Sequence, residues 1–251
     1  MTQGSQDKSQ LSVLCLFAHP DDEAFGSGGA LAGLVQKGHR LTVVCATNGD
    51  VGEISDPALA TPESLWEVRQ GELRRAMVVT GILDVRFLGY RDSGMDGTAD
   101  NENPASLFQA EPAKVEGQIA ALIKELSPDI VFTHDPTGGY GHPDHVTVYE
   151  RTTAVVESMD GKRPHLYYVC FPQGNFRKLW QMMTDAGITP PFAKEMLDSI
   201  GSPDDYVTTV KDVSAYADVK RESLQCHQTQ LDPNGPFGKL ASDVMTDWMS
   251  T

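Results

Sequence analysis

Short, mostly apolar runs, of which LSVLCLFA is the most continuous, alternate along this chain with segments whose apolar residues recur at helical spacing. Five such runs are rich in Val, Leu, Ile, Phe and Tyr, and they span residues 11–18, 40–47, 84–90, 129–134 and 165–171. An apolar run without polar alternation is typical of a strand that is buried on both faces, as in a parallel sheet. The runs therefore predict five strands in a mainly parallel sheet.

Amphipathic segments separate these runs, and turn residues mark their ends. Helices are expected over residues 28–38, 61–81, 111–128 and 144–159. Gly38 and Gly81 stand where a helix commonly ends in a left-handed residue, and Thr61 is expected to cap the start of the second helix. This alternation predicts an α/β fold with a doubly wound, mainly parallel sheet and helices on both faces.

The pattern becomes less regular after residue 171. Short helices over 171–197, a strand over 204–213 and a final helix over 216–231 are expected there. The length of 251 residues suits one large domain. We divide it into a flexible tail (1–10), a catalytic core (11–171) and a C-terminal extension (172–251) that completes the pocket within the same domain.

The composition of the chain argues against several classes of binding partner. The net charge is −15, which argues against binding to nucleic acid or to an anionic membrane. No apolar run approaches the ~20 residues of a membrane span, and the polar N-terminus lacks the apolar core of a signal peptide. The four cysteines form no Cys-x-x-Cys pair and indicate free thiols in a reducing compartment. We expect a soluble, cytoplasmic protein, and the sequence leaves a homo-oligomer open.

Polar clusters follow the first four predicted strands. In an open parallel sheet, ligands bind beyond the carboxyl ends of the strands, so these clusters are expected to meet at one edge. The clusters are HPDDE at 19–23, TNGDVGE at 47–53, RDSGMDG at 91–97 and HDPTGGYGHPDH at 134–145.

Two His-Pro-Asp sequences in these clusters predict a metal site. His19 and Asp22 follow the first strand, and His145 can reach the same point from the neighbouring strand. Two imidazoles, one carboxylate and an open position form a catalytic zinc arrangement, and zinc lowers the pKa of a bound water to about 7. Asp21 adjoins a ligand but should point differently. It is predicted to be the general base, with a cap on the following turn as its alternative role.

The residues before His145 are candidates for stabilising an oxyanion. His142, if protonated, could stabilise the negative oxygen of a tetrahedral intermediate, and Asp144 could hold that ring in its imidazolium form. Tyr140 offers a hydroxyl to the same oxygen, although simple packing is its alternative role. Together with the predicted zinc site, these residues favour a hydrolase.

The segments AHPDDE, GYRDSGM and GGYGHPDH resemble the LmbE/PIG-L family of zinc-dependent N-acetylglucosaminyl deacetylases, over roughly residues 11–152. SLQCHQTQLD is a weaker match. The resemblance is strongest to bacterial members of the mycothiol pathway. It implies a Rossmann-like core, a small amino-sugar substrate and release of its acetyl group. It also implies that Arg69 and Asp92 hold sugar hydroxyls.

Other functions fit parts of the pattern. One is an amidase acting on a larger amide, such as a mycothiol conjugate, because HQTQLDPNG is loosely similar to that branch. Two histidines and a carboxylate also bind iron(II) in oxygenases, although strand–helix alternation disfavours that class. A non-catalytic sugar-binding module would need neither Asp21 nor His142. Within the hydrolase hypothesis, iron(II) in place of zinc in the cell stays open.

Overall fold

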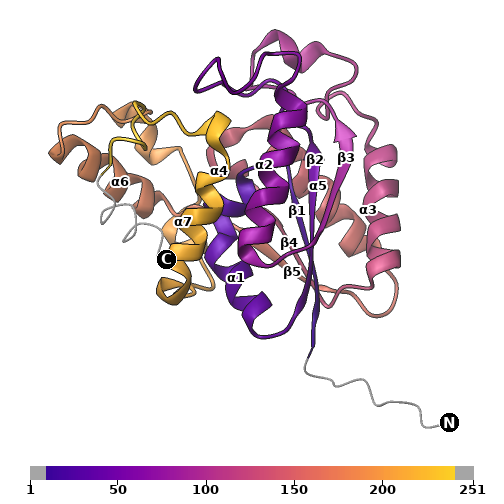
Figure 1. The fold of residues 1–251 in the computed structure, drawn as a ribbon. Helices are drawn as coiled ribbons and strands as arrows, with labels where there is room; N and C mark the ends of the chain where they lie inside the picture. Colours follow the sequence, from indigo (N-terminus) through magenta and orange to yellow (C-terminus); the bar gives the residue numbers. More distant parts are fainter. Residues whose placement is uncertain (1–9, 241–251) are drawn as a thin grey trace.

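The computed structural model describes residues 10–240, so residues 1–9 of the predicted tail and residues 241–251 lie outside the described part. A five-stranded sheet forms its centre, with the strand order β3-β2-β1-β4-β5 and every neighbouring pair parallel (Figure 1). This confirms the predicted α/β fold class. The strands are β1 Ser12–Phe17, β2 Arg40–Thr47, β3 Asp84–Tyr90, β4 Ile130–His134 and β5 His165–Val169.

The first strand lies in the middle of the sheet. Val13 of β1 pairs with Leu41 of β2 on one side and with Ile130 of β4 on the other. The chain runs outward from β1 to β3 in one direction and from β4 to β5 in the other. The strand order therefore reverses between β1 and β4, and this is the place where open α/β sheets bind ligands.

Helices cover both faces of the sheet (Figure 1). On one face, Leu31, Leu73 and Met77 pack in a core that includes Val13 and Phe17. On the other face, the alternate residues of β1 pack against two further helices, because successive side chains of a strand point to opposite faces. The helices of the first face are α1 Gly28–Gln36, α2 Leu65–Thr80 and α7 Ala217–Gln225, and those of the second are α3 Pro112–Leu126 and α5 Pro143–Ser158.

The expected helix ends are only partly correct. Gly81 ends α2 with a φ of 85°, and Gly38 follows α1 with a φ of 82°, as predicted. The predicted cap at Thr61 is wrong, because α2 begins at Leu65 after Ser64. Thr61 instead opens a separate turn, in which its carbonyl accepts the N–H of Ser64 at 3.1 Å. A single π-helical turn over Glu23–Ser27 precedes α1, and the sequence pattern did not predict it.

The C-terminal part is helical rather than mixed. It begins with α6 Gln173–Asp185, and the predicted strand over 204–213 is wrong: a 3₁₀ turn covers Asp204–Tyr206, and 207–213 form no strand. The valines there recur every third residue, at 207, 210 and 213, so all three could not share one face of a strand, and Val210 is 73% exposed whereas Val213 is buried. No helix in the described residues is long and apolar enough to cross a membrane. The remaining 3₁₀ turns are Ala99–Glu102, Lys194–Asp198, Ser214–Tyr216 and Gln228–Gln230, and a short helical turn, α4, covers Gly138–Gly141.

Candidate metal centre and active site

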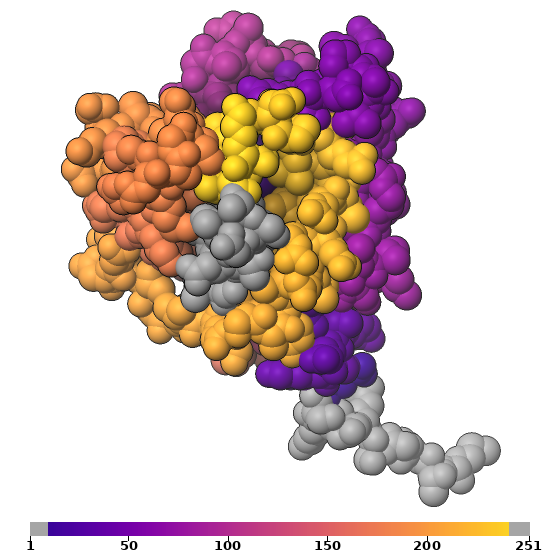
Figure 2. Space-filling view, turned by 60° about the vertical axis from the view of Figure 1, so that its left-hand side comes forward, coloured from indigo at the N-terminus to yellow at the C-terminus, as the bar shows by residue number. Residues whose placement is uncertain are grey.

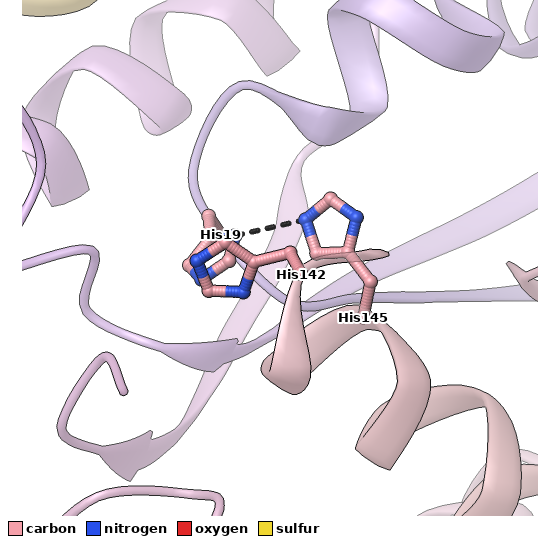
Figure 3. Close-up of side chains that lie close together, drawn as sticks. All are labelled: His19, His142 and His145. Atoms are coloured by element: carbon pink, nitrogen blue, oxygen red, sulfur yellow. Dashed lines mark hydrogen bonds between the residues drawn. The ribbon is translucent and has the colours of Figure 1, made fainter. Parts of the chain in front are cut away.

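The loops after β1 and β4 meet at the carboxyl edge of the sheet, at the reversal of strand order. His19 comes from the first loop, and His142 and His145 come from the end of the second loop and the start of α5 (Figure 3). Asp92 joins them from the loop after β3. These four side chains are buried, each with at most 6% of its surface exposed. The expected meeting of strand-end clusters is therefore observed.

The three predicted metal ligands converge on one point. The Nδ1 atom of His19 lies 3.0 Å from Nε2 of His145 and 3.6 Å from Oδ2 of Asp22 (Figure 3 shows the two histidines). The other oxygen of Asp22, Oδ1, lies 3.2 Å from Nε2 of His145. Two imidazole nitrogens and the two oxygens of one carboxylate, from two distant parts of the chain, thus face one another at short range.

Hydrogen bonds on the far side of each ring determine which nitrogen carries the proton. Nδ1 of His145 lies 3.0 Å from the carbonyl oxygen of Gly138, to which it can only donate. Nε2 of His19 lies 3.1 Å from Oδ2 of Asp144 and donates there. In the neutral rings, the two nitrogens that face each other therefore carry lone pairs. Two lone pairs beside a carboxylate repel unless a cation lies between them. Burial lowers the pKa of His19, but the carboxylates of Asp92, Asp144 and Asp22 outweigh burial and raise that pKa, so this point favours positive charge. A proton supplies that charge in the metal-free protein, and a metal ion would supply it when bound.

Other side chains near this point are less suited to bind the ion. Among the described residues, His134, His142, Asp92 and Asp144 also fall into potential metal-binding groups. However, Nδ1 of His142 accepts the N–H of Asp144 at 3.2 Å, and Nε2 of His134 accepts the N–H of Ala18 at 3.0 Å.

Asp144 supports a ligand rather than His142. Its Oδ2 accepts the N–H of Ser93 at 2.9 Å in addition to the bond from His19, and the Ser93 hydroxyl donates to Oδ1. Only the backbone N–H of Asp144 reaches His142, in place of the predicted carboxylate contact. A carboxylate on the far nitrogen of a metal-binding histidine fixes the orientation of the ring and raises its basicity.

The expected protonation of His142 is not supported. Burial, together with the neighbouring His19 and His145, lowers the pKa of His142 to about 2. This shift favours the neutral ring. Because Nδ1 accepts the N–H of Asp144, the proton of the neutral ring lies on Nε2. His142 can still donate a hydrogen bond from Nε2, as a neutral imidazole instead of the predicted imidazolium.

Asp21 occupies an unusual backbone conformation beside the ligand Asp22. Its φ is 117°, a region that residues with a side chain rarely adopt. Its N–H donates to Oε2 of Glu23 at 3.0 Å, and its Oδ2 lies 3.3 Å from Nη2 of Arg69. Burial raises the pKa of Asp21 to about 6, although Arg69 opposes the shift. A carboxyl group with such a pKa suits a general base that works near neutral pH.

The two residues expected to bind sugar hydroxyls differ in their surroundings. Arg69 is only 3% exposed, and its guanidinium donates to the carbonyl oxygens of Gly49 at 2.7 Å and Pro20 at 2.6 Å. Its donors therefore connect the loops after β1 and β2. Oδ1 of Asp92 accepts the N–H of Gly94 at 2.9 Å and lies 3.5 Å from Nε2 of His19, inside the cluster.

Tyr140 lies at the mouth of the site, where its side chain is 46% exposed. Its ring centroid is 5.2 Å from that of His145 and 6.1 Å from that of His142. Gly139 and Gly141 on either side have φ values of 69° and 85°, so the loop depends on glycine at both positions. Tyr140 therefore borders the histidines without being buried among them.

No role was predicted from the sequence for His134, Ser93 or His227, whereas Glu23 was expected to cap the helix start or to support a metal ligand. His134, the last residue of β4, stacks on His145 with the ring centroids 4.0 Å apart. Its position at the end of a predicted strand was a usable signal. Ser93 holds Asp144, and Glu23 binds His227 from the C-terminal part. No local pattern marks a pair that is separated by 204 residues.

The fold and the cluster define a Rossmann-like α/β protein with a candidate metal centre at the reversal point of its sheet. Residues 14–156 match the family PIG-L, described as GlcNAc-PI de-N-acetylase, and the chain belongs to this family. It is 39% identical over 251 residues to 1D-myo-inositol 2-acetamido-2-deoxy-alpha-D-glucopyranoside deacetylase of Thermobifida fusca, covering 92% of this chain and 87% of that protein. The enzyme of the same name from Acidothermus cellulolyticus is 36% identical, covering 93% of this chain and 84% of that protein.

Solved structures agree with the fold. N,N'-diacetylchitobiose deacetylase from Pyrococcus horikoshii superimposes with a TM-score of 0.59 at 22% identity, covering 96% of this chain and 75% of that chain. The A40926 pseudoaglycone deacetylase Dbv21 gives a TM-score of 0.57 at 21% identity, with 93% and 88% covered. These likenesses confirm the Rossmann-like architecture.

Proposed function

We propose that this chain is a zinc-dependent N-deacetylase that hydrolyses the acetamide of a small N-acetylglucosaminyl glycoside. The observation that carries the proposal is the convergence of His19, Asp22 and His145, with a second carboxylate of raised pKa, that of Asp21, on the residue that adjoins Asp22. The deacetylase names of the relatives, which match along most of the chain, support the same reaction. Their names also favour an inositol glycoside of N-acetylglucosamine as the substrate.

The spacing of the ligand atoms supports zinc. Zinc bonds of about 2.0–2.2 Å in a tetrahedral arrangement place the ligand atoms about 3.3–3.6 Å apart. The two imidazole nitrogens are 3.0 Å apart, and His145 and His19 lie 3.2 and 3.6 Å from different oxygens of Asp22, so a small shift of that carboxylate would bring one oxygen into range of both rings. When bound there, zinc would supply Lewis-acid polarisation and a more acidic water.

The side chains of the chain itself have distinct roles in this proposal. The Asp21 carboxylate accepts the proton of the attacking water and later returns it to the departing amine. Nε2–H of neutral His142 and the Tyr140 hydroxyl donate to the oxygen that becomes negative when the carbonyl is attacked. Asp144 orients His19. Asp92 holds the sugar, while Arg69 acts indirectly, by fixing the loop that carries Asp21.

An amine-release assay with metal-free and zinc-restored protein tests this function. The substrates are N-acetylglucosaminyl-inositol, N-acetylglucosaminyl-malate, free N-acetylglucosamine, N,N'-diacetylchitobiose and a thiol-conjugate amide. We expect zinc-dependent release of amine and acetate, fastest from the inositol glycoside. Release from the thiol-conjugate amide alone would favour the amidase alternative. No release from any of the five substrates would refute the proposal.

A further inference from the structure

A segment from the C-terminal part, residues 227–230, contacts elements that surround the proposed active site. It follows α7, and residues of this part form the surface between α6 and the N-terminal half of the chain (Figure 2, yellow). Thr229 donates to the carboxylate of Glu72 from its N–H at 2.8 Å and from its hydroxyl at 2.6 Å. Ser55 donates its N–H to the carbonyl oxygen of Thr229 at 2.9 Å. The segment is thus attached to α2 and to the loop after β2.

One contact of this segment reaches the loop after β1. Nε2 of His227 lies 2.8 Å from Oε1 of Glu23, and neither side chain has any exposed surface. The other ring nitrogen of His227, Nδ1, is buried without a hydrogen-bond partner among the described residues. All the hydrogen bonding of this imidazole is therefore directed at Glu23. A buried carboxylate needs such a partner, because an unpaired buried charge is strongly destabilising.

The second oxygen of Glu23 contacts the proposed general base. Oε2 accepts the backbone N–H of Asp21 at 3.0 Å, while the Asp21 carbonyl accepts the N–H groups of Ala24 and Phe25 at 2.9 and 3.0 Å. With its φ of 117°, Asp21 is in a strained region of backbone space. Such strain, of order 1–3 kcal/mol, persists only where the surroundings determine the conformation from several sides.

We propose that Glu23 and His227 form a positioning pair that holds the strained backbone of Asp21 and so aims its carboxylate at the reacting water. His227 fixes the rotamer of Glu23, and Glu23 fixes the peptide N–H of Asp21. Neither residue touches the substrate, so both act through Asp21. This inference rests on the proposed function, because it takes Asp21 as the base. It also gives the C-terminal part a direct role in the catalytic geometry.

Two disruptive and two conservative variants test the pair in the zinc-restored enzyme. His227→Ala and Glu23→Ala should each lower kcat about 10- to 100-fold, since a displacement of about 1 Å in a reacting group can cost that much. KM and bound zinc should stay near the wild-type values. His227→Gln keeps a donor for Glu23, and Glu23→Gln keeps an acceptor for the Asp21 N–H. Both should retain kcat within about threefold. His227→Ala leaves the Glu23 carboxylate buried without its partner, whereas Glu23→Ala removes that carboxylate, so Glu23→Ala remains informative if His227→Ala fails to fold.

A double-mutant cycle separates positioning from general damage. In an Asp21→Asn background, which keeps a residue that tolerates positive φ, His227→Ala or Glu23→Ala should lower the residual rate no further. An equal loss of rate in both backgrounds would overturn the inference, because the pair would then act through the ligand Asp22 or through the fold as a whole.

Amide hydrogen exchange gives a readout that does not depend on activity. In the metal-free protein, exchange at the Asp21 N–H should speed up at least about tenfold in Glu23→Ala and His227→Ala. Thr229→Val is the matched control, because it removes a buried hydrogen bond of the same segment that does not reach Asp21. It should lower Tm while leaving kcat and Asp21 exchange unchanged.

The outcomes separate this inference from the proposed function. If the wild type releases amine and Asp21→Asn abolishes that release, unchanged kcat and exchange in His227→Ala and Glu23→Ala overturn the positioning pair alone. If the wild type releases no amine from any substrate, the proposed function fails and the catalytic role of the pair fails with it. Faster exchange at Asp21 in Glu23→Ala would then still establish the contact to the backbone.

Discussion

The two loops that build the candidate site are held in different ways. The loop after β1 (residues 18–22) is fixed by side chains from elsewhere in the fold. Arg69 donates to its Pro20 carbonyl, and His134 accepts its Ala18 N–H. The loop after β4 (residues 135–142) combines internal support with one contact from outside. Left-handed glycines shape its backbone, Oδ1 of Asp135 accepts the N–H of Gly139 at 3.0 Å, and Oδ2 of Asp135 accepts the hydroxyl of Ser202 from the C-terminal part.

This difference matches the chemistry that we propose for each loop. The β1 loop carries two metal ligands and the general base, whose positions must be set to a fraction of an ångström, and remote side chains supply that constraint. The β4 loop carries the half-exposed Tyr140, which must let a substrate approach, and glycines allow its backbone to stay close to the ligands. The site therefore combines a β1 loop that is held by remote side chains with a β4 loop whose backbone depends on its own glycines.

Removing the metal should have the largest effect, because it affects both loops at once. His19 and Asp22 come from the first loop, and His145 follows the second. We expect chelation to reduce amine release to background and added zinc to restore it. His145→Ala should show the same loss without restoration. Full activity in protein shown by elemental analysis to contain no metal would contradict a metal-dependent reaction.

Changing Asp21 to Asn should give the next largest loss. The amide cannot take the proton of the water, so kcat should fall by about 10³-fold, within the usual range for a general base. Asn tolerates the positive φ of this position, so the fold and the bound zinc should be retained. The measurements are kcat and metal content. Loss of zinc from this variant would make Asp21 a ligand instead.

Asp144→Asn should act on the metal rather than on the proton. Its carboxylate orients His19, and loss of such a partner typically costs about 10- to 100-fold in metal affinity. With excess zinc, kcat should return close to the wild-type value. Competition with a chelator measures the affinity. Ser93→Ala, which removes one of the bonds to Asp144, is the milder control. An unchanged affinity would show that His19 needs no carboxylate support.

Tyr140→Phe should have a smaller effect on kcat. The hydroxyl is proposed to donate to the oxyanion, but the side chain is 46% exposed and water can partly replace it. We expect a loss of about tenfold, below the range for a fully buried donor. KM and bound zinc should not change. A wild-type kcat would leave Tyr140 in a packing role only.

Gly139→Ala should have the smallest effect and should concern stability. Gly139 has a φ of 69°, and an added Cβ would lie 3.3 Å from the Phe171 ring. We expect a loss of about 1–2 kcal/mol in the free energy of unfolding, the usual cost of a left-handed residue with a side chain. Gly117→Ala in α3, where an added Cβ meets nothing within 4 Å, is the matched control and should stabilise the protein slightly. Equal changes in the free energy of unfolding of both variants would contradict the dependence of the β4 loop on glycine at position 139.

The core of the fold could be predicted because its signals are local. Each strand is a short, mostly apolar run, with β1 the most continuous, and each run that precedes a polar cluster ends at the same edge of the sheet. The expected strand over 204–213 failed because its local signal is weak. Its valines recur every third residue, at 207, 210 and 213, without the two-residue alternation of a half-buried strand.

The sequence by itself determined the order of the elements, the fold class and the types of residue gathered at the strand ends. Only the tertiary structure decided which of these side chains face one another. It turned the Asp144 carboxylate to His19 instead of His142, directed Arg69 to the backbone, and paired Glu23 with His227. The physical reason is distance along the chain: apolar periodicity acts within a few residues, whereas a buried polar group must take its partner from whatever the packed fold brings within about 3 Å.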